Sequence, residues 1–270
     1  MHKKLKTSFW ENVFNILDFY HQNRIVNFLR PLHIYKVIDV GSHKGEFLSY
    51  ILKLKNVKKI FAFEPQIAIY KILSKNFSHK KIKITNIAID KEVSKKYIYI
   101  NKFTNTSTLS ILDKKSFYLK FKNLLTGSKK NFVQKYIVKT NTIDNLFCNI
   151  KLKNSLLKID VEGFELNVLK GMKEFLLNTT AAIELELNSR ALNLSNTKFN
   201  ELLSILKEFN YVPLRNADIE IESDISKLKV FDLVFVKKDF INIAKKSLSL
   251  TEFSENEINS WNEVYEKKFG

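Results

Sequence analysis

Cysteine is almost absent from this 270-residue sequence, in which Cys148 is the single thiol. One cysteine forms no internal disulfide and builds no thiolate metal cluster, and a lone thiol suits a reducing compartment. Long apolar runs are missing as well, because no stretch approaches the roughly 18 consecutive apolar residues that a membrane-spanning helix needs. Glu11 and Asp18 interrupt the apolar N-terminal region where a signal peptide needs an unbroken one. We therefore expect no transmembrane segment and a cytoplasmic protein.

Arginine is scarce although the chain carries a formal net charge of +17. Such a charge is typical of proteins that bind nucleic acids or anionic membranes, since clustered basic groups release counterions from phosphates. Nucleic-acid readers favour the bidentate fork of arginine, yet most basic residues here are lysines spread along the whole chain. The arginines are Arg24, Arg30, Arg190 and Arg215. We interpret the charge as a solvated basic surface and regard a nucleic-acid partner as unlikely.

Glycine is also rare, with 6 residues where average usage of ~7% predicts roughly 19. In a sequence with so few glycines, the remaining ones are informative, because glycine is hard to replace where the backbone turns sharply. Gly41, Gly45, Gly163 and Gly171 fall in two short stretches. These stretches are the first places to look for a functional site.

The N-terminal residues predict a helix. Apolar side chains recur at helical spacing over residues 8–30, and Pro31 ends the pattern. Two interpretations stay open for this helix: it packs on the core domain, or it mediates a homodimer or a membrane-surface contact.

From Lys36 the chain alternates strand and helix patterns, which predicts an α/β fold with a parallel sheet covered on both faces. The predicted strands are Val37–Val40, Lys59–Phe63, Ile82–Ile89, Leu156–Val161, Ala181–Leu187, Tyr211–Leu214 and Val230–Val236. The predicted helices between them are Glu46–Lys55, Ile67–Asn76, Phe164–Leu177 and Lys198–Phe209. Only a short irregular stretch joins the last two strands. We therefore expect a seven-stranded, mostly parallel, doubly wound sheet with one antiparallel strand.

An insertion interrupts this alternation at about residues 101–135. Tyr97–Ile100 and Tyr136–Lys139 resemble extra strands on either side of it. Ligands bind outside the carboxyl ends of parallel strands, on the side where such an insertion lies. The insertion is therefore either a lid or a solvated surface excursion.

The chain thus divides into three parts. An N-terminal helical extension occupies residues 1–35, the α/β domain residues 36–238, and a C-terminal tail residues 239–270. Within the tail, the apolar spacing predicts a helix over Glu252–Lys268.

The first dense stretch, Val37–Gly45, is an apolar run that ends in a glycine-bearing turn before a helix. Its pattern is D-x-G-x-x-x-G, with Asp39, Gly41 and Gly45 at the defined positions and Ser42 between the glycines. A strand, turn and helix of this kind present backbone N–H groups and a helix N-terminus to a ligand. The turn therefore predicts a cofactor site.

Glu64 closes the second predicted strand. In a nucleotide-binding α/β unit, an acid at this place accepts hydrogen bonds from both ribose hydroxyls. Asn86 and Ala88 end the third predicted strand, where they would line an adenine pocket if the ligand is a nucleoside. Glu64 alone also fits a helix N-terminal acid, but its spacing from the first turn favours ribose binding.

The second dense stretch, Lys158–Glu165, places charges where a buried parallel strand should be apolar. Lys158 and Asp160 lie on the same side of the strand, and Glu162 follows the strand end. Buried charges are costly unless they are paired or lie at an open edge. One interpretation is a structural Lys158–carboxylate pair with Glu162 and Glu165 as helix N-terminal acids. The other is a reaction centre beside the first turn.

These segments together resemble the FkbM-type methyltransferase family. The matching pieces are Asp39–Gly45, Phe61–Pro65, Ala88, Ser107–Leu109, Thr142–Asp144, Lys158–Glu165 and Ile183–Glu186. They occur in the family's order, and the Lys158–Gly163 piece is the most specific. The resemblance implies a Rossmann-like class I methyltransferase fold and S-adenosyl-L-methionine as cofactor. It also implies methyl transfer, in the EC 2.1.1 class, to a hydroxyl group of a sugar, a glycan or a small metabolite.

Carried over by this resemblance, the residues take separate roles. The cofactor-binding candidates are Asp39, Gly41, Ser42, Gly45, Glu64, Asn86, Ala88 and Asp160. Asp160 is the first candidate for the base that accepts the hydroxyl proton, and Glu162 is the second. Ser107, Thr108 and Glu186 are candidates for substrate contact.

Three alternatives stay open. Asp160, Glu186 and Asn188 would supply oxygen ligands for a metal-assisted reaction, although the favoured interpretation is strand-end acids that pair with local lysines. The charge leaves room for an RNA methyltransferase, but the N-P-P-Y-type loop of base methylation is missing after Asp160. The third alternative is a nucleoside-binding protein without catalysis.

Overall fold

The computed structural model describes residues 33–101, 132–150, 154–178, 180–188, 196–216, 230–240 and 250–252. The helix predicted over residues 8–30 lies outside the described residues, as do most of the C-terminal tail and residues 102–131 of the insertion. The secondary structure expected for residues 36–89 and 132–216 is therefore the part that the structure tests most fully.

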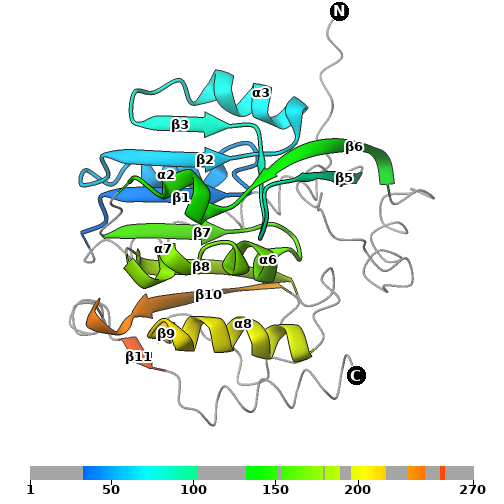
Figure 1. Cartoon of the computed structure of the whole chain (residues 1–270). Helices are drawn as coiled ribbons and strands as arrows, with labels where there is room; N and C mark the ends of the chain where they lie inside the picture. The colour runs from blue at the N-terminus through cyan, green and yellow to red at the C-terminus, as the bar shows by residue number, and fades with distance from the viewer. Residues whose placement is uncertain are drawn as a thin grey trace, which may run out of the picture.

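The central sheet has eight strands in the order β11-β9-β10-β8-β7-β1-β2-β3 (Figure 1). Their bounds are β1 Lys36–Val40, β2 Lys59–Phe63, β3 Ile82–Thr85, β7 Ser155–Ile159, β8 Thr180–Asn188, β9 Tyr211–Asn216, β10 Val230–Lys237 and β11 Leu250–Glu252. A smaller sheet, in the order β4-β6-β5, contains β4 Ala88–Ile89, β5 Lys95–Asn101 and β6 Phe132–Asn141. It confirms the two extra strands that flank the insertion.

The strand directions confirm the doubly wound fold. The pairs β3–β2, β2–β1, β1–β7 and β7–β8 are parallel, whereas β10 runs antiparallel to both β8 and β9. The seven predicted strands thus form one sheet with a single reversed strand. The eighth strand, β11, pairs antiparallel with β9 and was not predicted. Glu252, where the tail helix was expected to begin, belongs to this strand.

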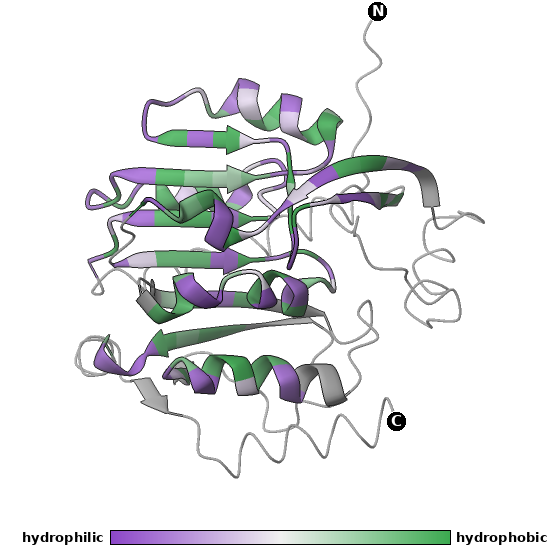
Figure 2. Cartoon of the chain, in the orientation of Figure 1, coloured by the Kyte–Doolittle hydropathy of each residue, from purple (hydrophilic) through white to green (hydrophobic). Residues whose placement is uncertain are grey.

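Helices cover both faces of the sheet, and alternate strand residues point to opposite layers. Val37, Ile60 and Leu156 pack with α2 (Glu46–Ile51) and α3 (Ile67–Asn76). Ile38, Phe61 and Leu157 pack with the helices on the other face. Those helices are α5 (Ile143–Phe147), α6 (Glu165–Lys170), α7 (Lys173–Asn178) and α8 (Asn196–Glu208). Figure 2 shows the central strands largely green between helices of mixed colour, as two apolar layers around one sheet require.

Two predicted elements are each divided in the structure. The strand predicted over Ile82–Ile89 is β3 and β4, which belong to different sheets. The helix predicted over Phe164–Leu177 is α6 and α7, interrupted at Gly171. A Cβ atom at Gly171 would lie 2.2 Å from the carbonyl oxygen of Asp90. The residue at the break therefore has to be glycine, because two backbone segments far apart in the sequence lie in close contact there.

Two caps fix the helices after β6. The Thr142 hydroxyl accepts a hydrogen bond from the Asn145 N–H at 3.0 Å, which caps α5. The Asp144 carboxylate accepts from the N–H groups of Glu174 and Phe175 at the start of α7. Asp144 thus caps a different helix from its own.

None of the helices in the described part of the chain combines the length and the apolar composition that crossing a bilayer demands.

Replacing Gly171 by alanine tests the contact that divides α6 from α7. We expect Gly171→Ala to lower the free energy of unfolding by about 1–3 kcal/mol, because the added methyl group forces apart two backbone segments. Urea unfolding followed by circular dichroism measures the change, with the exposed Lys173→Ala as the matched control. A Gly171→Ala protein as stable as the control would contradict the close contact.

Candidate active site

The three segments singled out in the sequence meet at one edge of the sheet. β1 pairs with β2 on one side and with β7 on the other, all in parallel, so their carboxyl ends lie side by side (Figure 1). The turn after β1, the acid after β2 and the charged loop after β7 follow these ends directly. The expected neighbourhood of β1 and β7 is confirmed.

The turn after β1 is held by backbone contacts on both sides. The N–H groups of Gly41 and Ser42 donate to the Phe63 carbonyl of β2 at 3.0 and 3.1 Å. Gly41 has a φ of 90°, and a Cβ atom there would lie 1.8 Å from the Asp160 carbonyl oxygen. Gly45 has a φ of 93° and faces the Phe77 ring, which a Cβ atom would meet at 2.2 Å. Both glycines of the predicted turn are therefore required by backbone conformation and by space.

Asp39 is fully buried on β1. Its two carboxylate oxygens have no hydrogen-bond partner among the described residues. Burial raises the pKa of Asp39 to about 6, against the opposing charge of Lys158. A buried polar group without a hydrogen-bond partner is expensive, and both oxygens of Asp39 keep the capacity to accept a hydrogen bond.

Glu64 is 3% exposed and holds the loops around it. Its Oε2 accepts from the His43 N–H at 3.0 Å, and its Oε1 accepts from the Gln66 N–H at 2.7 Å. Burial raises the pKa of Glu64 to about 7, while these N–H groups lower it. Each carboxylate oxygen has two lone pairs, so both oxygens keep the capacity to accept one further hydrogen bond.

Lys158 is a buried cation between acids of the neighbouring strands. Its Nζ donates to Asp160 Oδ2 at 2.8 Å, and the two side chains are 4% and 27% exposed. Asp39 is its register partner on β1 and the fully buried Glu184 is its register partner on β8. The predicted Lys158–carboxylate pair is therefore present, and Asp160 remains the more accessible member of the group.

The loop after β7 carries two further acids in different surroundings. Glu162 is half-buried and has a φ of 52°, a left-handed conformation that is uncommon for residues other than glycine. Glu165 is buried, and its Oε1 accepts from the Gly163 N–H at 2.9 Å. Burial raises the pKa of Glu165 to about 7. Glu165 is thus the expected acid in the first turn of α6, and it is buried and braces the loop from inside.

His43 connects the turn after β1 with two neighbouring segments. It has a φ of 43°, its N–H donates to Glu64, and its Nδ1 lies 3.0 Å from Glu46 Oε1. The histidine therefore links the turn after β1 both to the acid after β2 and to the start of α2. The D-x-G-x-x-x-G pattern alone carries no signal for this link, which depends on the pairing of β1 with β2.

Of the other predicted site residues, the structure describes Asn86 and Ala88 but not Ser107 and Thr108. Asn86 donates from Nδ2 to the carbonyl oxygens of Glu64 and Pro65 at 2.8 and 3.0 Å, so it supports the Glu64 loop. Ala88 is 4% exposed and packs with β5 and β6 in the smaller sheet. Ser107 and Thr108 lie outside the described residues.

The suggested metal ligands are only partly described. Glu186 and Asn188 lie within β8 rather than after it, and their side chains are outside the described part of the structure. Among the described residues, no group of three or more His, Cys, Asp or Glu side chains is arranged to hold a metal ion. The set Asp160, Glu186 and Asn188 stays a hypothesis.

Comparison with known proteins gives one family and several distant structures. A family model described as a methyltransferase FkbM domain matches residues 39–213. A search of curated proteins by sequence gave no match.

The solved structures that resemble the chain are distant. The FkbM methyltransferase from Methylobacillus flagellatus KT has 14% identity and a TM-score of 0.45 over 76% of this chain, which spans 44% of that structure. A fibrillarin pre-rRNA processing protein of Methanococcus jannaschii has 13% identity and a TM-score of 0.43, with coverages of 77% and 69%. An rRNA methylase from Streptococcus thermophilus has 10% identity and a TM-score of 0.42, with coverages of 79% and 94%. The chain thus spans less than half of the first of these proteins.

The buried acid Glu165 predicts a pH-dependent stability. Its pKa is about 7 in the folded protein and about 4.3 in an unfolded chain, so the folded state binds more protons between these values. Its contribution to stability is therefore complete below about pH 4 and is lost as the pH rises toward 7, by up to about 3 kcal/mol.

Glu165→Gln removes this titration but keeps an oxygen that accepts from Gly163. We expect its free energy of unfolding to fall less between pH 4.5 and 7 than that of the unchanged protein. Urea midpoints across this range measure the slope, and the exposed Glu208→Gln should leave it unchanged. Parallel curves for Glu165→Gln and the unchanged protein would contradict the assignment.

Proposed function

The chain belongs to the FkbM methyltransferase family, and from this we propose that it transfers the methyl group of S-adenosyl-L-methionine to a hydroxyl group. The proposed acceptor is a sugar, a glycan or a small hydroxylated metabolite. The observation that carries the proposal is the set of acids at the edge of β1, β2 and β7. Asp39 and Glu64 are buried with unused acceptor capacity, and Asp160 beside them is 27% exposed.

The residues after β1 and β2 fit the donor molecule by their chemistry. Asp39 offers two carboxylate oxygens without a partner among the described residues, which suits the ammonium group of a methionine moiety. Glu64 retains one lone pair on each oxygen, which suits two ribose hydroxyls. Gly41 and Gly45 let the turn pack directly against the Asp160 carbonyl group and the Phe77 ring. The chain therefore holds acceptors for both polar ends of the cofactor.

Asp160 fits the acceptor side of the reaction. When bound, S-adenosyl-L-methionine supplies an electrophilic methyl group on a positively charged sulfur. The residues of the chain must align the acceptor oxygen with that methyl group and remove its proton as the new O–C bond forms. Asp160 is the proposed base, and its ion pair with Lys158 holds the carboxylate toward the edge. Glu162 is the second candidate, since it follows in the same loop.

The location of the protein is part of the same proposal. We propose a cytoplasmic enzyme, in agreement with its single, exposed cysteine.

Glu64 tests the cofactor side. We expect Glu64→Gln to bind S-adenosylhomocysteine about tenfold or more weakly than the unchanged protein, because a charged acceptor of two hydroxyls is lost. Isothermal titration calorimetry measures the affinity, and Glu208→Gln is the matched exposed control. If the unchanged protein binds neither S-adenosylmethionine nor S-adenosylhomocysteine, the proposed function is wrong.

Asp160 tests the chemical step. We expect Asp160→Asn to lower turnover about 100-fold, because general-base catalysis contributes at least this much. Binding of S-adenosylhomocysteine should fall far less than turnover. The assay is S-adenosylhomocysteine release on a panel of sugars and glycan fragments, with Glu162→Gln in parallel. Full activity of Asp160→Asn with loss in Glu162→Gln would move the role of base to Glu162.

A further inference from the structure

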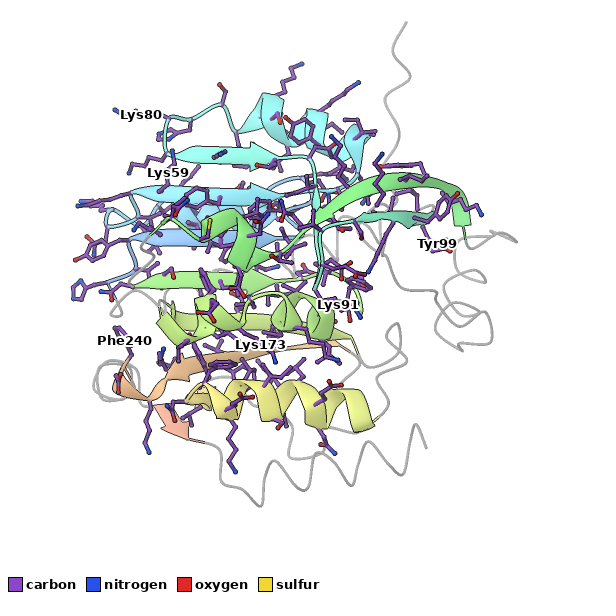
Figure 3. All side chains as sticks on the ribbon, in the orientation of Figure 1. Lys59, Lys80, Lys91, Tyr99, Lys173 and Phe240 are labelled. Atoms are coloured by element: carbon purple, nitrogen blue, oxygen red, sulfur yellow. The ribbon has the colours of Figure 1, made fainter. Side chains whose placement is uncertain are left out.

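The hairpin formed by β5 and β6 has two faces of different character. Alternate residues point to opposite sides of a strand, and Ile98 and Val138 are buried with Ala88 on the inner side. The outer side, which we call the hairpin face, pairs Lys95 with Lys139, Tyr97 with Ile137, and Tyr99 with Lys135. Figure 3 labels Tyr99 on this hairpin, at the opposite side of the molecule from Lys59 and Lys80.

The hairpin face is poorly arranged for stability in water. Lys95 and Lys139 are both exposed and directly opposite each other, and like charges in this position destabilise a strand pair. Tyr97 and Ile137, the next pair, are 49% and 55% exposed. Lys135 Nζ lies 5.0 Å from the centre of the Tyr97 ring. A bound molecule with negative charges and flat apolar surfaces would offset the repulsion between Lys95 and Lys139 and would cover Tyr97 and Ile137.

The charges on the hairpin face determine the sign of the charge that a bound molecule must carry. Neither β5 nor β6 contains an aspartate or a glutamate, so the hairpin face carries three lysines and no acid of its own. Lys96, on the other side of β5, is paired with Asp90 and Glu92. Lys96 on the inner side is therefore neutralised by acids of the described residues, whereas none of the three outer lysines forms an ion pair with a described acid.

The shape of the hairpin face favours an extended chain of sugar rings. From Lys95 to Tyr99 the strand spans about 13 Å, which is too long for one small metabolite. Tyrosine and isoleucine side by side provide apolar surface for the ring faces of sugars, and lysine ammonium groups suit single carboxylates. The hairpin contains no arginine, whose planar fork is preferred for phosphate backbones.

The hairpin is tied to both halves of the candidate active site. The Tyr136 hydroxyl accepts from the Ile67 N–H at 3.0 Å, just after the Glu64 loop. Lys96 Nζ lies 5.7 Å from the centre of the Phe164 ring, in the loop that follows Asp160. Both contacts come from the inner side of the hairpin, so they fix the hairpin beside these loops, while the hairpin face lies on the opposite side of the same two strands.

We propose that the hairpin face is a docking surface for an acidic polysaccharide, a chain of sugar rings that bear carboxylate groups. This inference rests on the proposed function, because it names the class of acceptor molecule for the same enzyme. Binding itself does not require methyl transfer, so the two can be tested separately.

The test is direct binding at low salt. A hexamer of galacturonic acid is titrated by calorimetry, with maltohexaose as the neutral probe and an oligouridylate of matched length as the nucleic-acid probe. We expect the acidic hexamer to bind, the neutral one not to bind, and the affinity to fall as salt is added.

Three variants identify the surface. Lys95→Ser combined with Lys139→Ser should weaken binding about tenfold, and Tyr97→Ser should also weaken it. Lys80→Ser combined with Lys83→Ser removes the same charge near the amino end of β3 and should have no effect. Circular dichroism and urea unfolding verify that each variant is folded.

Three results overturn the docking surface: no binding of the acidic hexamer, equal loss in both double variants, or tighter binding of the oligouridylate. Titration of S-adenosylhomocysteine into the same proteins separates this from the proposed function. If the acidic hexamer binds the hairpin face but S-adenosylhomocysteine does not bind, the docking surface stands and the methyltransferase proposal fails. If S-adenosylhomocysteine binds but the acidic hexamer does not, the proposed acceptor class is wrong and the proposed methyl transfer stands.

Discussion

A single buried ammonium group makes the carboxyl edge of this sheet possible. Asp39, Lys158 and Glu184 occupy one register row across β1, β7 and β8, in a layer where each is at most 3% exposed. Carboxylates in such surroundings cost several kcal/mol each unless a cation compensates them. Lys158 lies between the two strands that carry them and also binds Asp160. Without it, neither β1 nor β8 would tolerate an acid so close to the core.

The acids of the edge are thereby divided into two kinds. Burial raises the pKa values of Asp39 and Glu64 to about 6 and about 7, which marks the side next to β2 as shielded from water. Asp160 lies on the same face but is partly open to solvent. The side next to β2 is dry and has carboxylate oxygens that can still accept hydrogen bonds, whereas the side of Asp160 is wetter and its carboxylate is paired. A transfer between two substrates needs such an arrangement, because one substrate must be held while the other enters.

Local patterns predicted most of the fold, and contacts across the chain account for what they missed. The run from Val37 to Gly45 was recognised because strand, glycine turn and helix follow each other directly. The need for glycine at position 171 was missed because the atom that a side chain there would meet is the carbonyl oxygen of Asp90, about eighty residues earlier in the chain. Glu165 has the place of an ordinary helix-start acid in the sequence, and only its packing shows that it is buried. The site was thus predictable as a set of neighbours, whereas the burial and partners of each acid depend on strand register.

The absence of a side chain at Gly41 has a consequence for how this domain tolerates change. The turn after β1 touches the loop after β7 through backbone atoms, at a separation that leaves no room for a Cβ atom. Contact between main chains is indifferent to the identity of nearby side chains. Substitutions of side chains around the edge therefore leave this contact between the two loops in place. The domain can change the chemistry of the edge while the main chains on either side of it keep their spacing.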